Sequence, residues 1–432
     1  MALLERIYTA VYGVPTVIAI FILFFIISIK TRFVGVRKIG ASVKAVINGN
    51  KHGKSGDTLK AVCVSLCATV GTGNIVGVAG AVSIGGPGAV FWMWISALLS
   101  LSVKFSEIYL SLVYKKKSSA YGYIYAAVKS EALRRAFLIF GIITAFGIGN
   151  LTQTNAAADS IALFTGGMSI SPSIIRIVTG IVFMLLCLVI LIRENSAVSF
   201  CEKFLPFMAA AYILLCLAAL VSSRKALPKA LSLIFRGAFC PMAVTGGAVG
   251  SIIAGIKSGM ARGIFSNEAG LSTAALAYEK SKTAPYETAL FGIFEVLIDT
   301  MLLCTLTALV VISSNSVAYG SDFGAYSVLC AFISVLGNRS ILFLCPIICF
   351  FAFSSVIGWG IYARRFAEKC GFNTAVLVCI YAITCIIGAA VTADAAWMIA
   401  EMSSLSMMFV NCYSLIFHRN KLSYKNLVRL KH

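Results

Sequence analysis

The chain has 432 residues, of which 59% are hydrophobic and only 12% are charged, about half the charged share of a soluble domain. This composition excludes a large water-soluble domain and indicates an all-α, polytopic membrane protein with a single integral domain. The net charge of +20 does not indicate nucleic-acid binding, because the Lys and Arg residues cluster between apolar runs, in the pattern of the positive-inside rule.

Apolar runs of about 18 or more residues predict eleven membrane spans. The first run lacks the basic flank and the cleavage site of a signal peptide, so we interpret it as a helix. A shorter run at 325–337 predicts a re-entrant or interfacial helix. The spans are 13–29, 58–83, 88–113, 137–160, 173–192, 203–222, 243–276, 288–313, 340–363, 373–391 and 395–417.

The charged loops predict how these spans are oriented. Most of the 36 Lys and Arg residues fall on the inner side if the N-terminus lies outside and the tail at 418–432 is cytoplasmic. We therefore expect a multi-pass protein of the plasma (inner) membrane. None of the three His residues falls in a predicted span, and no nucleophile–base or metal cluster is visible, so neither an enzyme nor a cofactor is expected.

The span at 58–83 contains a stretch that disfavours a helix. Residues 67–88 hold seven glycines, and the run Gly71-Thr72-Gly73-Asn74 is poorly suited to continue one. Peptide groups freed at membrane depth must find partners inside the protein. A break here therefore predicts a site for a small polar solute or an ion.

The span at 243–276 is also rich in glycine and carries Lys257, Arg262 and Glu268. If the first span is set aside, the remaining ten form two sets of five, 58–222 and 243–417, each opening with an interrupted span. The matching positions of the two interrupted spans in the two sets favour an inverted-repeat secondary transporter with its site at the midplane. Close helix packing through small residues is the alternative explanation of the glycines.

Two broken helices offer both kinds of helix terminus to a zwitterion. The amides near Gly71, Thr72 and Gly73 suit a carboxylate, and the carbonyl groups near 264–266 suit an ammonium group. A sodium ion needs several oxygens. The candidates are Asn74, the carbonyl groups of Thr69 and Val70, and the hydroxyl groups of Ser354 and Ser355.

The remaining buried ionisable residues have structural as well as functional interpretations. Lys104 and Glu107 are three apart on one predicted face, which favours a structural pair. Arg262 and Glu268 are consistent with an inner-gate network. Alternatively, the Arg262 side chain would snorkel, with its charged end at the membrane interface. Glu295 and Asp299 are like charges four residues apart, and if they meet, one of them would hold a proton.

Several motifs together resemble the alanine or glycine:cation symporter family over about residues 15–365. The first group is Gly71-Thr-Gly-Asn-Ile-Val-Gly-Val78, Ile84-Gly-Gly-Pro-Gly-Ala-Val-Phe-Trp-Met-Trp94 and Lys104-Phe-Ser-Glu107. The second group is Gly147-Ile-Gly-Asn-Leu-Thr-Gln-Thr-Asn155, Arg262-Gly-Ile-Phe-Ser-Asn-Glu-Ala-Gly-Leu271, Gly292-Ile-Phe-Glu-Val-Leu-Ile-Asp-Thr300 and Cys304-Thr-Leu-Thr-Ala308.

The resemblance implies sodium- or proton-coupled uptake of alanine, glycine or another small neutral amino acid. It implies a 5+5 inverted-repeat fold of the amino acid/polyamine/cation superfamily type with one additional N-terminal helix. By the family pattern, the substrate would be lined by the Gly71–Asn74 loop, by Phe265, Ser266, Asn267 and Glu268, by Gln153, and by Ser355 and Trp359. An interhelical hydrogen bond is the alternative role for Gln153, and a packing aromatic is the alternative for Trp359.

Two segments depart from the family pattern. Ser272-Thr-Ala-Ala275 stands where the family usually has Gly-Ser-Ala-Pro, and the last span lacks the expected Asp, Asn and Pro pattern between Glu401 and Asn411. Both departures bear on gating or substrate choice rather than on the fold. The alternatives to a sodium symporter are a proton-coupled amino-acid transporter, a non-transporting membrane sensor or scaffold on the same fold and, less favoured, a channel.

Overall fold

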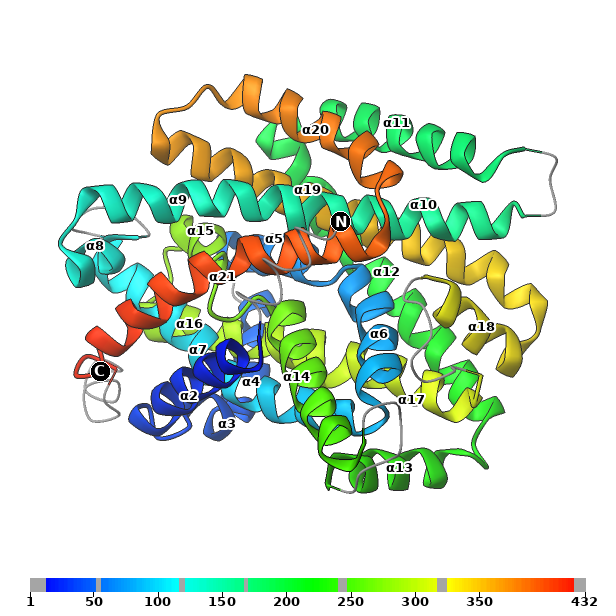
Figure 1. Ribbon diagram of the computed structural model, residues 1–432. Coiled ribbons are helices and arrows are strands. Elements are labelled where there is room, and N and C mark those ends of the chain that lie inside the picture. Colours follow the sequence, from blue (N-terminus) through cyan, green and yellow to red (C-terminus); the bar gives the residue numbers. More distant parts are fainter. Residues whose placement is uncertain are drawn as a thin grey trace.

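The computed structural model describes residues 13–51, 56–115, 121–166, 170–239, 247–316 and 325–422, and within these ranges every regular element is helical (Figure 1). The elements are α2 (Val14–Lys30), α3 (Val34–Arg37), α4 (Ile39–Lys51), α5 (Gly56–Thr69), η1 (Thr72–Asn74), α6 (Val76–Gly85), α7 (Gly88–Lys115), α8 (Gly122–Val128), α9 (Glu131–Phe146), η2 (Gly147–Leu151), α10 (Thr152–Phe164), α11 (Pro172–Leu191), α12 (Glu194–Ser222), α13 (Leu227–Phe239), α14 (Gly247–Asn267), α15 (Ala274–Ala277), η3 (Tyr278–Lys280), α16 (Pro285–Val296), η4 (Leu297–Cys304), α17 (Thr305–Ser314), α18 (Ala325–Leu336), η5 (Asn338–Ser340), α19 (Ile341–Cys370), α20 (Thr374–Ala390) and α21 (Ala393–Phe417).

The described part of the chain has seven helices long and apolar enough to cross a membrane, or eight if one bent pair counts as a single span. This bears out a polytopic helical membrane protein, while the predicted number of eleven is not established. Helix α12 begins at Glu194, nine residues before the predicted span at 203–222. Two predicted regions lie partly outside the described residues: the start of the span at 243–276, and the tail beyond residue 422.

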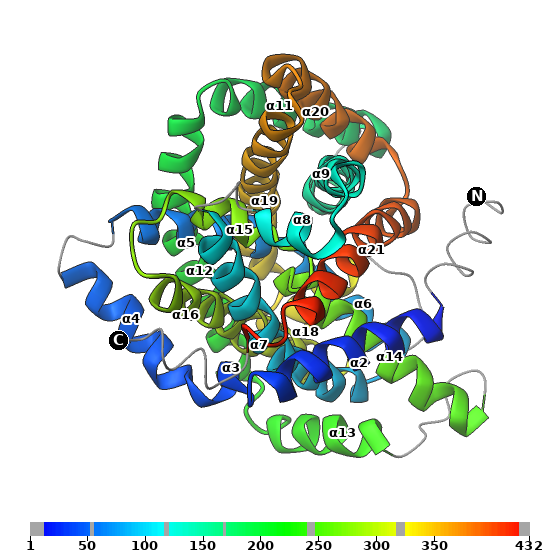
Figure 2. The same cartoon turned by 90° about the vertical axis from the view of Figure 1, so that its left-hand side faces the viewer.

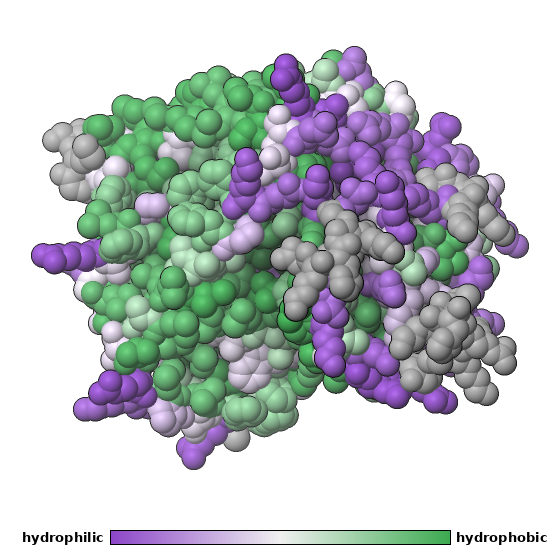
Figure 3. All heavy atoms as spheres, turned by 180° about the vertical axis from the view of Figure 1, so that it is seen from behind, coloured by the Kyte–Doolittle hydropathy of each residue, from purple (hydrophilic) through white to green (hydrophobic). Residues whose placement is uncertain are grey.

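A broad apolar surface covers much of the face seen in Figure 3, and most hydrophilic residues gather on one side of it. Side chains on α11, α12 and α20 make up much of it, because these helices turn large hydrophobic residues outward. Examples are Ile174, Val178, Leu185, Val189, Phe207, Leu214, Val221, Val376, Ile380 and Ile383. Such a surface is expected of a protein whose solvent is hydrocarbon.

Figure 2 looks along the length of α9 and shows how the helices are layered. Helices α11 and α20 form one flank, and α2 and α3 lie on the opposite flank, in agreement with Figure 1. The most buried long helices are α7, with 72% of its span buried, and the segment containing α19, with 67%. They carry side chains that reach the interrupted helices between them.

The first predicted break is present between α5 and α6. The two helices are bent by 58° at a gap of at most four residues, and η1 lies in the gap. Gly71 precedes η1 with φ −141° and ψ −159°, an extended conformation that cannot continue an α-helix. The glycine-rich run therefore unwinds where the sequence predicted it.

The second interruption lies a few residues later than predicted. Helix α14 continues through 264–266 and ends at Asn267. The chain then turns through three residues with positive φ: Glu268 at 54°, Gly270 at 93° and Ser272 at 59°. Gly270 is the residue for which this conformation carries no steric cost, whereas Ile264 and Phe265 have no local reason to leave the helix. The segment 272–275, which departs from the family pattern, contains the start of α15.

Two helices contain π-helical segments, η2 within the span from Glu131 to Phe164 and η4 within the span from Pro285 to Ser314. Such widened turns are frequent at functional sites. The residues that approach the first break from these two spans are Gln153, two residues after η2, and Asp299, inside η4. The 12-residue helix α18 stands where the short run at 325–337 predicted a helix that does not span.

Candidate functional site

The break between α5 and α6 is closed by a buried carboxamide from α10. The side-chain oxygen of Gln153 accepts hydrogen bonds from the backbone N–H and from the hydroxyl group of Thr72, each at 2.9 Å. The Gln153 amide nitrogen donates to the carbonyl oxygen of Ile148 at 3.1 Å, within η2. Gln153 thus forms the interhelical bond that the sequence left open as an alternative, and it does so to the peptide groups of the break.

Ser355 of α19 faces the other side of the same break. Its hydroxyl oxygen lies 3.2, 3.1 and 3.4 Å from the carbonyl oxygens of Cys67, Ala68 and Val70. These carbonyl groups belong to the end of α5, where helix carbonyls lack intrahelical partners. A side chain at Gly71 would run into the Ser355 hydroxyl group and come within 2.8 Å of Gln153 Oε1. The break, Gln153 and Ser355 are therefore packed against one another.

Gly73 differs from Gly71 in its surroundings. It is half-buried, and a Cβ atom added to it would meet nothing within 4 Å. Its φ is not in the positive range. There is accordingly free space beside the peptide groups of η1, at the centre of the predicted substrate-binding residues.

Asn74 connects the first break to α14 and η4. Its amide nitrogen donates to Asp299 Oδ1 at 2.7 Å, and its side-chain oxygen accepts from the N–H of Gly71 at 3.0 Å. Asp299 Oδ2 accepts hydrogen bonds from Ser266 and Thr300, both at 2.8 Å. The two interrupted helices thus share one buried carboxylate.

The predicted cation-binding residues lie around this break, and each of their side chains has a protein partner. Thr69 donates to the carbonyl oxygen of Leu66 at 3.4 Å, and Ser354 donates to that of Phe351 at 2.9 Å. Val70 contributes its carbonyl group, which faces Ser355. Hydroxyl oxygens that donate in this way keep lone pairs for a cation, so these residues retain the ability to coordinate one.

The second interruption is held by two charged side chains of α7. The ammonium group of Lys104 donates to the carbonyl oxygen of Asn267 at 3.0 Å, at the negative end of α14. Glu107 Oε1 accepts from the N–H groups of Gly270 and Ser272 at 2.8 and 3.1 Å, and Asn411 Nδ2 donates to it at 2.5 Å. The predicted pairing of Lys104 with Glu107 is therefore replaced by separate partners, because each charge satisfies one side of the same helix break.

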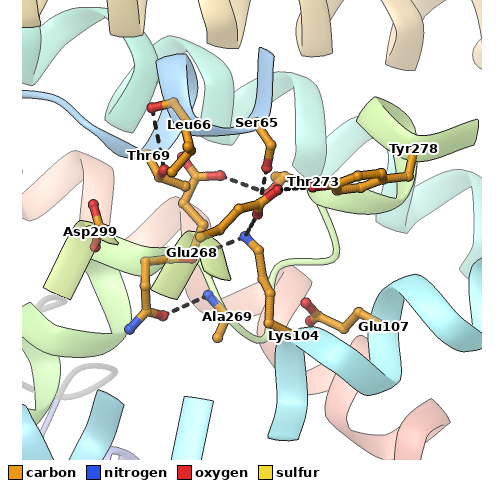
Figure 4. Close-up of polar contacts among 12 residues, drawn as sticks. Ser65, Leu66, Thr69, Lys104, Glu107, Glu268, Ala269, Thr273, Tyr278 and Asp299 are labelled. Atoms are coloured by element: carbon orange, nitrogen blue, oxygen red, sulfur yellow. Dashed lines mark hydrogen bonds and ion pairs between the residues drawn. The ribbon is translucent and has the colours of Figure 1, made fainter. Parts of the chain in front are cut away.

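Glu295 of α16 links α5 to η3 and α7, and Figure 4 shows its partners Ser65, Tyr278 and Lys104 close together. Its carboxylate accepts from Ser65 at 2.8 Å and from Tyr278, and it lies 3.7 Å from the Lys104 ammonium group. Glu295 and Asp299 thus bind different sets of donors. The expectation that one of them holds a proton because the two meet has no support in these contacts.

Arg262 forms a buried ion pair with the last helix. Its guanidinium group lies 3.1 Å from Glu401 Oε1 and stacks 4.0 Å from the centre of the Trp397 ring. Phe265 packs against the same Trp397 ring at 5.1 Å. Phe265, predicted to line the substrate, thus packs against a cluster of cation–π and ion-pair contacts between α14 and α21.

Trp359 of α19 is fully buried and packs against Gly149, where an added Cβ would overlap the indole ring. Its indole N–H has no acceptor among the described residues. Asn267, also predicted to line the substrate, donates its side-chain amide to Thr300 at 3.2 Å. All the predicted site residues are buried, apart from the half-buried Gly73 and Arg262. Trp359 and Ser354 make their contacts to Gly149 and Phe351, away from the peptide groups of the breaks.

Sequence reasoning missed several residues that complete these contacts. Glu401 and Asn411 were noted only as departures from a pattern, although both are polar residues in an apolar span and hence expected to have partners. Ser65, Tyr278 and Trp397 gave no local signal. A polar cavity of about 340 Å³ was also unforeseen; it lies between the starts of α5 and α12 and the end of α19, lined by residues such as Asp57, Glu194, Glu202 and Arg365.

Comparison with known proteins agrees with the motifs. The model of the sodium:alanine symporter family matches residues 1–427. The chain is 33% identical to an uncharacterized transporter of Haemophilus influenzae, over 96% of this chain and 93% of that protein. It is 34% identical to the sodium/alanine symporter AgcS of Methanococcus maripaludis, over 72% and 69%. It is 29% identical to the probable sodium/glutamine symporter GlnT of Bacillus subtilis, over 88% and 80%.

Members of this family are transporters, and the match extends over the two helix breaks and over the residues of α7, α10, α16 and α19 that close them. The fold is that of a multi-pass helical membrane protein, and the family it matches is one of amino-acid:cation symporters. The chain therefore belongs to the sodium:alanine symporter family.

Proposed function

We propose that the protein is a secondary active symporter that couples inward sodium movement to uptake of a small neutral amino acid, alanine or glycine, by alternating access. The observation that carries this proposal is the unwound, buried segment at Gly71–Asn74 with free space beside Gly73. Bare peptide N–H groups bind a carboxylate, and the closeness of Gln153 and Ser355 leaves room for a small side chain only.

The substrate would compete for bonds that the protein now makes to itself. In the structure the N–H of Thr72 is held by Gln153, and that of Gly71 by Asn74. A substrate carboxylate at η1 would replace the Gln153 oxygen at Thr72, and the Gln153 amide would turn to the substrate. Binding then opens an internal contact, which links occupancy to conformation.

The proposed arrangement has eleven spans, with α2 as the additional N-terminal helix before two sets of five. The N-terminus lies outside and the tail in the cytoplasm, in the plasma (inner) membrane. Under this orientation Glu401, eight residues after the start of α21, lies in the outer half. We therefore assign the Arg262–Glu401 pair to the outer side of the site, rather than to the inner gate first expected.

The relatives support the cation more uniformly than the substrate. The names of AgcS and GlnT both contain sodium, whereas they differ between alanine and glutamine. We therefore take sodium as the coupling ion, with no further cofactor. Proton coupling is the second candidate, favoured by the number of buried carboxylates around Lys104.

Gradient-driven uptake by purified protein in liposomes tests the proposal. An inward sodium gradient should accumulate labelled alanine or glycine, and collapse of the gradient with a sodium ionophore should release it. A choline gradient is the matched control. Accumulation driven by a proton gradient but not by sodium would replace the coupling ion, and no accumulation with either would favour a sensor or scaffold.

A further inference from the structure

Five charged side chains are buried together where the two interrupted helices approach α7. Four are carboxylates and one is an ammonium group, and none is more than 1% exposed. Figure 4 shows Glu268 beside the Lys104 ammonium group, with Glu107 and Asp299 farther to either side. The five are Lys104, Glu107, Glu268, Glu295 and Asp299.

Six of the eight acidic oxygens in this cluster have donors, and the two without one are Glu107 Oε2 and Glu268 Oε1. Both oxygens of Glu295 and both of Asp299 accept hydrogen bonds. The Lys104 ammonium group is engaged with the carbonyl oxygen of Asn267 and with Glu295. Lys104 makes no hydrogen bond or ion pair with Glu268, so the Glu268 carboxylate has room for a further ligand.

Glu268 has one satisfied and one unsatisfied oxygen. Its Oε2 atom accepts a hydrogen bond from Thr273 at 2.7 Å, while Oε1 has no hydrogen-bond partner in the structure. The side chain is only 1% exposed. A buried carboxylate oxygen without a donor is unfavourable, so the geometry indicates a missing positive ligand.

The end of the other broken helix offers neutral oxygen groups on the side toward which Glu268 extends. In Figure 4 the Glu268 side chain extends toward the turn of Leu66 and Thr69 at the end of α5. Thr69 donates its hydroxyl proton to Leu66, which leaves its lone pairs available. The end of α5 also carries the negative pole of the helix dipole. All of these features favour a cation.

The ligand chemistry narrows the kind of cation. The described residues contain no set of three or more His, Cys, Asp or Glu side chains arranged to hold a metal, which disfavours zinc and other tightly held multivalent ions. One carboxylate with neutral hydroxyl and carbonyl oxygens suits a small, hard monovalent ion.

We propose that Glu268 is an anionic ligand of a sodium ion that also contacts Thr69, at the junction of the two helix breaks. Thr69 is one of the expected cation ligands, whereas Asn74, Ser354 and Ser355 are not needed for this site. The proposal rests on the proposed function, because an ion here joins α5 to the segment after α14, the two elements around which alternating access would occur.

Equilibrium binding of radioactive sodium to detergent-purified protein tests this site without any transport. Glu268→Gln should weaken sodium binding by about tenfold or more, because ligand charge sets cation affinity. Glu268→Asp should keep part of the affinity, and Thr69→Val should lose severalfold. Sodium-dependent thermal stabilisation, measured against choline, should fall in the same order.

Glu295→Gln is the matched control, since it removes a buried carboxylate of the same cluster whose oxygens already have donors. It should lower the melting temperature in choline yet keep sodium affinity. Wild-type sodium affinity in Glu268→Gln, an equal loss in Glu295→Gln, or a melting temperature that responds to pH and not to sodium would each overturn the site. If Glu268→Gln binds sodium normally and still takes up substrate with sodium, this site alone is refuted. If the wild-type protein binds sodium at this site but shows no uptake, only the proposed function is refuted.

Discussion

Gly71 and Gly73 stand two residues apart in the same motif but differ in what a side chain would meet. A Cβ at Gly71 would overlap Ser355 and crowd Gln153, whereas a Cβ at Gly73 would enter open space. Gly71 is therefore required by packing. Gly73 is not required by packing, so its lack of a side chain keeps space free for a ligand.

This contrast predicts opposite effects on stability. Gly71→Ala should lower the free energy of unfolding by about 1–3 kcal/mol, the usual range for an overpacked site. Gly73→Ala should keep it within about 0.5 kcal/mol, or raise it, because the unfolded chain loses freedom. Thermal unfolding in detergent measures both, and Gly40→Ala on α4, another site with no atom near the added Cβ, is the control. Equal destabilisation by the two substitutions would contradict the arrangement at η1.

At the scale of elements, the two breaks are satisfied by different kinds of partner. The first, at 70–74, is closed by neutral side chains, Gln153 and Ser355, that can exchange their bonds for a substrate. The second, at 268–272, is closed by the ammonium group of Lys104 and the carboxylate of Glu107. Lys104 and Glu107 bind the peptide groups that the two charges of a zwitterion would otherwise bind. The hydrogen bonds to the peptide groups of the second break are therefore structural.

Glu107 is accordingly expected to hold the second break together. Glu107→Ala leaves the N–H groups of Gly270 and Ser272 without an acceptor, at a cost of about 1–3 kcal/mol each. Glu107→Gln keeps one acceptor oxygen and should lose less. Thermal unfolding ranks the two variants, and Glu131→Gln, at a half-exposed helix start, should change little because exposed ion pairs contribute little. A melting temperature unchanged in Glu107→Ala would refute this role.

The positions of the breaks show what local sequence can predict. The glycine run at 71–74 has no good helical alternative, so the first break was predicted at its observed place. The second was predicted at 264–266, yet the helix continues to Asn267, because its end is determined by Gly270 and by side chains of α7 more than 150 residues earlier. Such distant partners leave no local signal.

The same limit applies to the candidate site. A polar site at the first break was predictable from the cost of bare polar groups in lipid. Asn74 was selected there as an oxygen ligand, whereas Gln153 came from the resemblance to the family. Their partners were not predictable, because Thr72 and Gln153, or Arg262 and Glu401, meet only through the folded bundle. Ser65 and Tyr278 likewise have no feature in the sequence that indicates their hydrogen bonds to Glu295.

At the scale of the whole molecule, the fold surrounds one interrupted helix with two of its most buried elements. Helices α7 and α19 are largely enclosed, whereas α11, α12 and α20 turn apolar side chains outward. The outward surface suits lipid, and the enclosed centre holds the polar residues. The proposed function therefore requires that the amino acid binds in the free space beside Gly73.

Uptake of alanine relative to glycine by Gly73→Ala in liposomes is the most direct measurement of that claim. The added methyl group should reduce alanine uptake relative to glycine uptake by about tenfold or more, since one methyl-sized clash in a closed site discriminates by that amount. The ratio does not depend on how much protein is folded, and Gly40→Ala should leave it unchanged. A wild-type ratio in Gly73→Ala, with sodium-driven uptake intact, would contradict the account.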